Sequence, residues 1–343
     1  MSIDKQIGLG FVGLGWWGSV LAQAAIDSKV AKVEGCFART EKSREEFAEK
    51  FDAKNYSSLD DLLKDSCVDA VVIASSNGVH FEHAISAARA GKHIHLEKPM
   101  ALRISDAKEI VRACEESNVR LHIGQNFRRW PMFRFAKEQV SAENLGLISI
   151  AISQFSGNLG LVSGIDSLRW DPLENPGGPL YSYTIHLSDV MEFLFGEVVE
   201  VTANCGKVGG PSMTKDSAAS VLRFGSGQVG IISGSYLSPM SFTFEIQGSK
   251  ANLLLSNAHM PRIQKEGQEA WEAEFFDLDL DFISGRASAN AEQFVDLHAA
   301  VRTGKTPEVS GIQGVRALAI MRAILLSDLE KRSVSIEEIL DEE

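Results

Sequence analysis

The chain has 343 residues, of which 44% are hydrophobic and 23% are charged, and its formal net charge at pH 7 is -12. This length predicts two domains of roughly 150 residues each, with cores large enough to need no disulfide or metal. The acidic balance argues against nucleic acids and anionic membranes as partners, because phosphate groups attract basic surfaces.

The first half of the chain alternates short apolar runs with segments of helical pattern. The apolar runs predict strands at 7–12, 30–37, 68–74, 93–96 and 120–123. The segments between them predict helices at 17–26, 41–51, 81–90 and 106–116, and a further helix that Ser58 caps with Asp61 three residues on. Alternation of this kind is typical of a parallel, doubly wound sheet. We therefore predict an α/β dinucleotide-binding Rossmann domain over residues 1–125.

The pattern changes after residue 125, where strands follow one another more directly. Strands are predicted at 147–154, 220–224, 229–233 and 242–247, and helices at 131–139, 185–195, 289–302 and 314–330. Gly225-Ser226-Gly227 between two of the strands indicates a hairpin. We expect residues 126–343 to form an α+β domain with a largely antiparallel sheet.

Cysteine spacing and the N-terminal residues bear on the compartment. The cysteines Cys36, Cys67, Cys114 and Cys205 lie far apart and form no CxxC pair, which favours a reducing environment over a disulfide or zinc framework. The first residues lack the order of a signal sequence, and no run of about 18 apolar residues is present. We expect a cytoplasmic protein.

A glycine motif, Gly13-Leu14-Gly15-Trp16-Trp17-Gly18, follows the first strand and opens the first helix. In this context Gly13 makes the turn, Gly15 admits a pyrophosphate close to the backbone, and Gly18 allows the helix to pack on the strand. The alternative is a tight glycine turn without a ligand. Trp16 and Trp17 either flank the cofactor or belong to the core.

The end of the second strand bears on the choice between NAD and NADP. An acidic residue about 20 positions after the glycines usually binds the NAD ribose, and Glu34 has roughly this spacing. The strand runs on to Phe37, however, and Arg39 follows it. An arginine suits a 2′-phosphate, so NADP is favoured slightly over NAD. The alternatives are a solvated Arg39 at a helix start and a Glu34 outside the adenosine site.

Glu97-Lys98-Pro99 follows the predicted strand 93–96. Ligands of open parallel sheets bind beyond the carboxyl ends of the strands, so a lysine here faces the cofactor crevice. Pro99 fixes the turn, which argues against an ordinary surface lysine.

With these motifs the chain resembles the Gfo/Idh/MocA oxidoreductases over nearly its whole length. The resemblance is carried by the glycine motif, 75–80, Gly91-Lys92-His93, 97–99, 124–129, 177–196 and 303–305. It implies that Lys98 is catalytic or orients the substrate, and that the C-terminal sheet is open and often mediates homo-oligomers, here a dimer or tetramer. It also implies cofactor contacts at Ser75, Asn77, His80 and Glu97, and substrate contacts at Asn126, Arg128, Arg129 and Trp170.

One departure from the family concerns its Asp-x-x-x-His pattern. His186 matches the histidine, but Ser182 stands at the aspartate position. Residues four apart on a helix share a face, so an aspartate there would orient the imidazole, whereas serine offers a hydrogen bond without a charge. Tyr183 or Tyr181 is a substitute proton donor. The alternative for His186 is a packed histidine at a domain seam.

Pairs of histidines raise the question of a metal. His80 and His83 lie three residues apart, and His93 and His95 alternate on one strand, but no carboxylate stands at a supporting spacing. We therefore expect no metal site.

The predicted reaction is hydride transfer between nicotinamide and a carbinol carbon. Lys98 would bind the reacting hydroxyl and stabilise the developing alkoxide, and His186 would accept the proton. The resemblance implies a sugar, polyol or related cyclic alcohol as substrate. One alternative is an enzyme that retains its cofactor and uses transient oxidation for elimination, epimerisation or glycoside cleavage. Another is a non-catalytic dinucleotide sensor, which the serine at position 182 favours slightly and Lys98 opposes.

Overall fold

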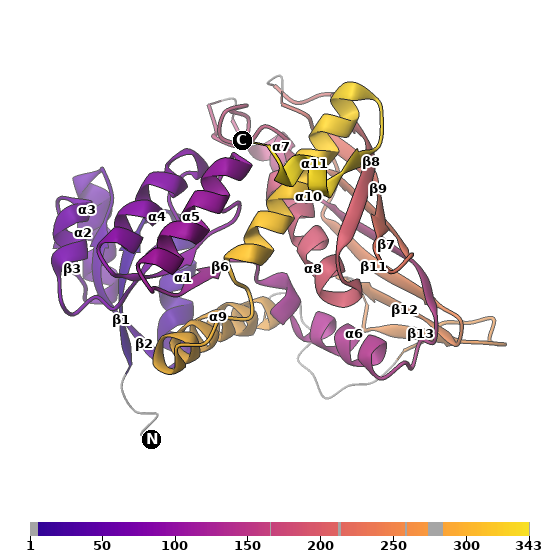
Figure 1. The fold of residues 1–343 in the computed structure, drawn as a ribbon, viewed down its shortest axis with the longest axis horizontal. Helices are drawn as coiled ribbons and strands as arrows, with labels where there is room; N and C mark the ends of the chain where they lie inside the picture. Colours follow the sequence, from indigo (N-terminus) through magenta and orange to yellow (C-terminus); the bar gives the residue numbers. More distant parts are fainter. Residues whose placement is uncertain (1–5, 165, 212–213, 258, 274–283, 343) are drawn as a thin grey trace. The chain divides into compact units, whose positions relative to one another are not determined.

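A computed structural model describes residues 6–164, 166–211, 214–257, 259–273 and 284–342. The chain forms two compact units (Figure 1). The first comprises Met1–Asn126 with Ala287–Val315, and the second comprises Phe127–Arg286 with Arg316–Glu343. The division near residue 125 that the sequence predicts takes no account of the return of 287–315 to the first unit.

The first unit contains a six-stranded parallel sheet, which confirms the predicted doubly wound fold. Its strands are β1 (Ile7–Val12), β2 (Ala31–Phe37), β3 (Lys54–Tyr56), β4 (Ala70–Ile73), β5 (His93–Leu96) and β6 (Leu121–Ile123). The order across the sheet is β3-β2-β1-β4-β5-β6, and all neighbours run parallel. The order reverses between β1 and β4, which is where doubly wound sheets bind their ligands. Of these strands, only the short β3 was not predicted from the sequence.

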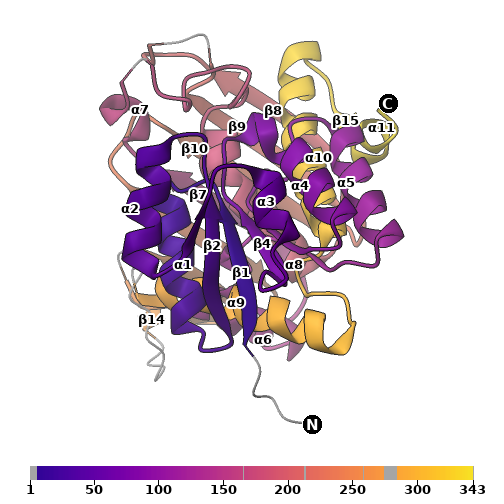
Figure 2. The same ribbon diagram turned by 90° about the vertical axis from the view of Figure 1, so that its left-hand side faces the viewer.

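Helices follow each of the first five strands. They are α1 (Trp16–Asp27), α2 (Glu41–Phe51), α3 (Leu59–Lys64), α4 (His80–Arg89) and α5 (Ile104–Glu116). Figure 2 looks onto β1, β2 and β4, with α1 and α2 on one side and α3, α4 and α5 on the other. The Ser58 hydroxyl accepts a hydrogen bond from the Asp61 amide at 3.1 Å, which confirms the predicted cap of α3.

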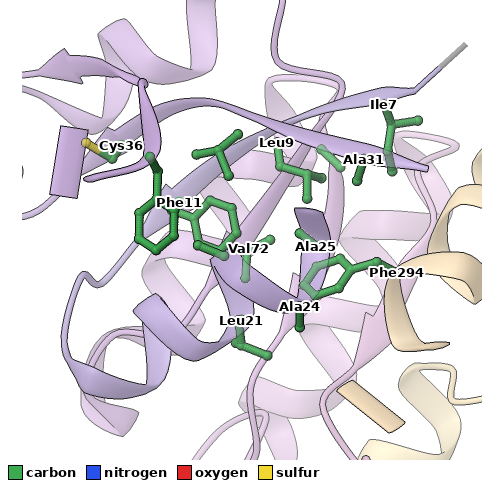
Figure 3. Close-up of a cluster of buried hydrophobic side chains, with 14 of the residues drawn as sticks. Ile7, Leu9, Phe11, Leu21, Ala24, Ala25, Ala31, Cys36, Val72 and Phe294 are labelled. Atoms are coloured by element: carbon green, nitrogen blue, oxygen red, sulfur yellow. The ribbon is translucent and has the colours of Figure 1, made fainter. Parts of the chain in front are cut away.

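The core of this unit follows from the alternation of side chains along β1. Ile7, Leu9 and Phe11 point to one face, where they meet α1, α2 and α9 (Ser284–Thr303) (Figure 3). Phe294 of α9 is fully buried in this cluster. Complete burial of such a side chain is worth about 1.5–3 kcal/mol, so the return of the chain through α9 stabilises the Rossmann sheet directly.

The second unit contains a nine-stranded sheet that is antiparallel at every pairing except that of β7 with β10. Its order is β14-β13-β12-β11-β7-β10-β9-β8-β15, which confirms the predicted open, largely antiparallel sheet. The predicted hairpin joins β9 to β10. The strands are β7 (Ile148–Ser156), β8 (Val198–Gly206), β9 (Ser217–Phe224), β10 (Val229–Ser235), β11 (Ser241–Gly248), β12 (Ala251–Ser256), β13 (Arg262–Lys265), β14 (Glu272–Ala273) and β15 (Val334–Ser335).

One face of this sheet packs against helices. Met191 of α8 (Ile185–Phe195) lies against Gly230 of β10, and Ser327 of α10 (Gly311–Glu330) accepts a hydrogen bond from the Ala203 amide of β8. The remaining helices are α6 (Pro131–Ser141), α7 (Leu159–Val162) and α11 (Ile336–Leu340). Within the described residues, no helix has both the length and the apolar character that crossing a membrane requires.

Candidate active site

The glycine turn lies between β1 and α1, at the carboxyl end of the central strand. Gly13 has a φ of 94°, and a Cβ there would lie 2.4 Å from the Ser75 amide nitrogen. A Cβ on Gly18 would lie 2.3 Å from the Gly13 carbonyl oxygen. A Cβ on Gly15, by contrast, would meet nothing within 4 Å. Gly13 and Gly18 are therefore required by packing, whereas Gly15 leaves open space at the start of α1, as a bound pyrophosphate would need.

The two tryptophans of the motif differ in their surroundings. Trp16 is 68% exposed, whereas Trp17 is half-buried and packs against the hydrophobic core. Trp17 also hydrogen-bonds the Glu97 carboxylate, which links the glycine turn to the end of β5. Trp17 is thus partly a core residue, and Trp16 lies on the surface beside the open space at Gly15.

The end of β2 presents two cations. Arg39 is exposed directly after the strand, and Arg44 of α2 donates a hydrogen bond to the Ala38 carbonyl at 2.9 Å. Glu34 lies at a bulge in the pairing of β1 with β2, and its carboxylate forms an ion pair with Lys32. Glu34 therefore stands short of the strand end, outside the usual ribose-binding position.

Glu97 is a buried carboxylate at the end of β5. Its Oε2 accepts a hydrogen bond from the Lys98 amide at 3.2 Å, and its Oε1 lies 3.8 Å from Nε2 of His95, which is long for a hydrogen bond. Burial acts to raise the pKa of Glu97, but His95, the charge of Lys98 and the hydrogen bond with Trp17 together hold that pKa below its usual value. An ionised carboxylate therefore lies next to Lys98.

Two further histidines lie behind Glu97. The rings of His95 and His122 stack with centroids 4.9 Å apart, and Nε2 of His122 lies 3.5 Å from a carboxylate oxygen of Asp296. His95 also stacks on Phe294. In the described parts of the chain, no group of three or more histidine, cysteine or acidic side chains is arranged to hold a metal ion.

His80 joins the turns that follow β4 and β5. Its Nδ1 lies 2.8 Å from the Pro99 carbonyl oxygen, and its Nε2 lies 3.1 Å from the Ser75 carbonyl oxygen. The neighbouring His83 contacts the Ser75 hydroxyl at 3.0 Å. Asn77 begins a short 3₁₀ turn (Asn77–Val79) before α4. Ser75, Asn77 and His80 therefore all line the turn between β4 and α4, at the same edge of the sheet as Lys98.

In the second unit, Leu180–Thr184 forms a π-helical turn that leads into α8. His186 is buried, and its ring stacks on Phe127 with centroids 4.2 Å apart. π-helical turns are frequent at functional sites. Stacking on Phe127 fixes the ring plane of His186, the histidine of the family pattern.

The two tyrosines of the turn face different surroundings. Burial raises the pKa of Tyr181 to about 12, with charges from Arg322 and Glu342 nearby. Burial also raises the pKa of Tyr183, whose ring stacks on Phe155 and lies close to Tyr236. Tyr183 and Ser182 thus share Tyr236 as a neighbour, whereas Tyr181 lies near Arg322 and Glu342 toward the C-terminus.

Ser182 belongs to a chain of hydrogen bonds. The Tyr236 hydroxyl donates to the Ser182 hydroxyl, and the Asn175 amide nitrogen donates to the Tyr236 hydroxyl at 3.1 Å. The same nitrogen donates to the Arg169 carbonyl at 3.0 Å. Because a carbonyl oxygen only accepts, this contact fixes the orientation of the Asn175 amide and the direction of the whole chain.

The remaining residues expected at the substrate site are buried. Arg128 forms an ion pair with Asp189 of α8, with Nε 2.9 Å from Oδ2, and Asn126 donates to Asn290 at 2.8 Å. Trp170 is 1% exposed and packs edge-on against Tyr236. Arg129 is also buried.

Sequence reasoning missed several residues of these networks, namely Arg44, Arg169, Asn175, Asp189 and Tyr236. Tyr236 follows β10 directly, and a polar aromatic residue at a strand end is a usable signal. Arg169 precedes Trp170, which the resemblance had singled out. Arg44 falls within the helical charge pattern of α2, where nothing distinguishes it.

A parallel sheet with a glycine turn after β1 at its switch point, and a lysine after β5, two strands away at the same edge, is the arrangement of a dinucleotide-dependent oxidoreductase. Family models agree, since residues 7–125 match an oxidoreductase NAD-binding Rossmann fold and residues 137–336 match the C-terminal α/β domain of the same family. The chain belongs to the Gfo/Idh/MocA oxidoreductases.

Some relatives match over nearly the full length of this chain. A myo-inositol 2-dehydrogenase from Thermotoga maritima is 28% identical over 97% of this chain and 99% of its own. A scyllo-inositol 2-dehydrogenase (NADP(+)) from Bacillus subtilis is 24% identical, with 96% of each chain covered. Among solved structures, an oxidoreductase from Desulfitobacterium hafniense described as NADPH-dependent has a TM-score of 0.90 at 26% identity, covering 98% of this chain and 99% of its own.

Proposed function

We propose that this enzyme transfers a hydride between NADP and a carbinol carbon of a sugar, polyol or related cyclic alcohol. The observation that carries the proposal is Lys98, which follows β5 beside the buried Glu97 carboxylate, at the sheet edge that also bears the glycine turn. The inositol dehydrogenases among the relatives support the substrate class.

The residues present fit a dinucleotide. Open space at Gly15 and the N-terminus of α1 would receive the pyrophosphate, and Ser75, Asn77 and His80 line the adjoining turn. Arg39 beyond β2 would contact a 2′-phosphate, and for this reason NADP is proposed over NAD. When bound, the nicotinamide supplies the hydride acceptor or donor.

The chain's own residues would manage the proton and the charge. Lys98 would hold the reacting hydroxyl and stabilise negative charge on its oxygen as the alcohol is oxidised. His186, oriented by its stacking on Phe127, would take the hydroxyl proton. Tyr183, whose raised pKa keeps the phenol protonated, is a second candidate proton donor for the reverse direction, in which a carbonyl is reduced. Glu97, fixed by the Lys98 amide, would keep the lysine backbone in place.

A substrate panel tests the proposal. Sugars and inositols would be offered with NAD⁺ and NADP⁺, and formation of reduced cofactor would be followed by its ultraviolet absorbance. Lys98→Met keeps most of the side-chain length but removes the ammonium, so turnover should collapse while cofactor binding persists. His186→Ala should lower turnover by about 10²–10⁴. Near-normal turnover in Lys98→Met would overturn the assignment, as would the absence of net cofactor reduction across the whole panel.

The open sheet supports a homo-oligomer. Its outer face carries one row of adjacent side chains across five strands. Four of the five are apolar, and all are half-exposed or exposed: Leu254, Glu245, Ile152, Ile231 and Val221. We propose that a second copy covers this face. Light scattering should give a dimer or tetramer for the native protein and a smaller species for Val221→Lys.

The four free cysteines are consistent with a cytoplasmic location.

A further inference from the structure

We propose that His95 and Glu97 favour the oxidised form of the cofactor. His95 keeps the buried Glu97 carboxylate ionised, and the negative charge of Glu97 offsets the ammonium of Lys98 beside the cationic ring of an oxidised nicotinamide. This inference rests on the proposed function, which brings the nicotinamide and the reacting hydroxyl to Lys98. All three residues belong to β5 and the turn after it, within the first unit.

His95 is a fully buried polar side chain that lacks a hydrogen bond. Its exposed fraction is 0%, and among the described residues neither of its ring nitrogens has a hydrogen-bond partner. Buried polar atoms are seldom left unpaired, because removing them from water without a partner destabilises the fold. A buried histidine with two unpaired nitrogens therefore calls for a role beyond packing.

The His95 ring is held with one nitrogen toward Glu97. The ring stacks on His122 of β6, with centroids 4.9 Å apart, and on Phe294 of α9, with centroids 5.2 Å apart. His122 in turn lies 3.5 Å, at Nε2, from a carboxylate oxygen of Asp296 on α9. Nε2 of His95 lies 3.8 Å from Oε1 of Glu97, and within the described parts of the chain this oxygen also has no hydrogen-bond partner. Two unpaired atoms thus lie opposite each other.

The carboxylate selects the tautomer of His95. A hydrogen on Nε2 points the positive end of an N–H bond at Glu97, whereas a lone pair there would be repelled by the negative charge. At 3.8 Å the contact is longer than a hydrogen bond, so it acts as a charge–dipole attraction, which is strong in a buried site of low dielectric. His95 therefore stabilises the ionised form of Glu97.

Glu97 lies on the side of the sheet toward which the nicotinamide is directed. The strand order places β2, with Arg39 after it, on one side of β1, and β4 and β5 on the other. A dinucleotide with its pyrophosphate at Gly15 and its adenosine near Arg39 directs its nicotinamide toward β4 and β5. Trp17, two residues after Gly15, hydrogen-bonds the Glu97 carboxylate and so ties it to the glycine turn.

The charges at this place distinguish the two forms of the cofactor. Lys98 contributes one positive charge beside Glu97. The ring of an oxidised nicotinamide carries another, whereas the reduced ring is neutral. Two cations at close range repel each other, and a buried carboxylate beside them offsets the repulsion. The benefit falls on the oxidised cofactor, because only that form brings the second cation.

The contribution of His95 makes the effect dependent on pH. Burial acts to raise the pKa of Glu97, whereas His95, the charge of Lys98 and the Trp17 indole hold that pKa below its usual value. Glu97 of the native protein therefore stays ionised on both sides of neutrality. Without His95 the pKa should rise, and buried carboxyl groups can reach about 8–9. The negative charge would then be lost as the pH falls through neutrality.

The test measures cofactor binding and needs no substrate. Titration calorimetry at about pH 6 and about pH 8.5 would give the dissociation constants of NADP⁺ and NADPH, with NAD⁺ and NADH as a second pair. Glu97→Gln removes the charge and keeps the size of the side chain. It should weaken binding of the oxidised form relative to the reduced form by about three- to thirtyfold at both pH values. An unchanged ratio in this variant would overturn the proposal.

Two variants of His95 separate its N–H group from its bulk. His95→Phe keeps a ring for the two stacks but removes both nitrogens, so the oxidised form should lose more affinity at about pH 6 than at about pH 8.5. His95→Gln returns an N–H donor and should keep the native ratio at both values. A native ratio in His95→Phe at both pH values would show that His95 does not act on Glu97. If His95→Phe does not fold, His95→Asn takes its place, because the shorter amide does not reach Glu97.

Controls separate this effect from a loss of fold. His93→Phe removes another histidine of β5, whose Nδ1 accepts a hydrogen bond from the Arg120 amide at 2.9 Å, and should keep the native ratio. Glu116→Gln removes an exposed carboxylate of α5 and should do the same. Thermal unfolding of each variant would show that the fold persists. Infrared spectra should show a protonated carboxyl band in His95→Phe at about pH 6 that the double variant with Glu97→Gln lacks.

Failure of this inference can be distinguished from failure of the proposed function. If sugars or inositols are oxidised while Glu97→Gln binds both forms of the cofactor with the native ratio, the inference is wrong and the proposed function stands. If no alcohol is oxidised but the ratio changes as expected in Glu97→Gln and His95→Phe, the inference stands and the proposed function fails.

Discussion

A Cβ placed on Gly124 would lie 2.6 Å from Oε1 of Glu97 and 2.8 Å from its carboxyl carbon. Glu97 is buried and accepts a hydrogen bond from the Lys98 amide, so moving its carboxylate aside would cost free energy. Gly124→Ala should therefore destabilise the protein by about 1–3 kcal/mol, the usual cost of overpacking. Urea unfolding would measure the loss. Gly164→Ala is the control, because a Cβ there meets nothing within 4 Å, and equal stability of the two variants would contradict the prediction.

Gly15→Ala should weaken cofactor binding without affecting the fold. The added methyl group meets no protein atom within 4 Å but occupies the space proposed for the pyrophosphate. The variant should keep the native unfolding temperature and bind NADPH more weakly in a fluorescence titration. Gly13→Ala offers the contrast, since its positive φ and its contact with Ser75 make it a folding defect. Unchanged NADPH affinity in Gly15→Ala would show that the glycine motif does not bind the cofactor.

Arg39→Ala should weaken NADPH binding more than NADH binding. Loss of a hydrogen bond to a charged phosphate costs about 1.5–3 kcal/mol, and NADH has no 2′-phosphate to lose. Arg44→Ala is a useful comparison, because Arg44 supports the Ala38 and Arg39 carbonyls and its loss should loosen the turn for both cofactors. The two dissociation constants of each variant would be measured by titration. A native preference for NADH would show that NADP was the wrong choice.

The stability of the second unit should fall in acid through Asp328. This buried carboxylate accepts from the Cys205 amide and pairs with Lys215 and Lys331, and although burial opposes it, the pKa is lowered to about 2. A depressed pKa contributes stability that is complete above the unfolded value of about 3.9 and is lost as the pH falls toward 2. Asp328→Asn should therefore flatten the dependence of unfolding on pH in this window. Asp166→Asn, at an exposed position, should leave the dependence as in the native protein.

The fold was largely predictable because its signals are local. The predicted strand over 7–12 matches β1, and the predicted helix over 185–195 matches α8, since hydrophobic periodicity and glycine boundaries mark both. The strand β8 was missed, because its exposed and buried residues do not alternate cleanly. The return of 287–315 to the first unit depends on contacts such as that of Phe294 with the β1 cluster, which no spacing in the sequence indicates.

The residues of the candidate site differ in the same way, because only those that belong to a local motif could be predicted from the sequence. Lys98 and the glycine turn were found because a motif at a strand end carries its own geometry. The partners of Ser182 were not found, because Tyr236 lies 54 residues away along the chain and reaches Ser182 only through the folded sheet. The sequence revealed the missing aspartate, and only the structure revealed the hydroxyl and the arginine beside that position.

The placement of α9 has a consequence for synthesis on the ribosome. The Rossmann sheet is translated first, yet Phe294 and Leu297, which complete its core, emerge only after most of the second unit has been made. Until then, the nascent first unit exposes the apolar surface of β1 and α1 that α9 covers in the finished protein. This enzyme therefore cannot mature one domain at a time. Its cofactor domain is completed only near the end of translation, and we expect a product truncated at Asn126 to expose this apolar surface and to bind chaperones.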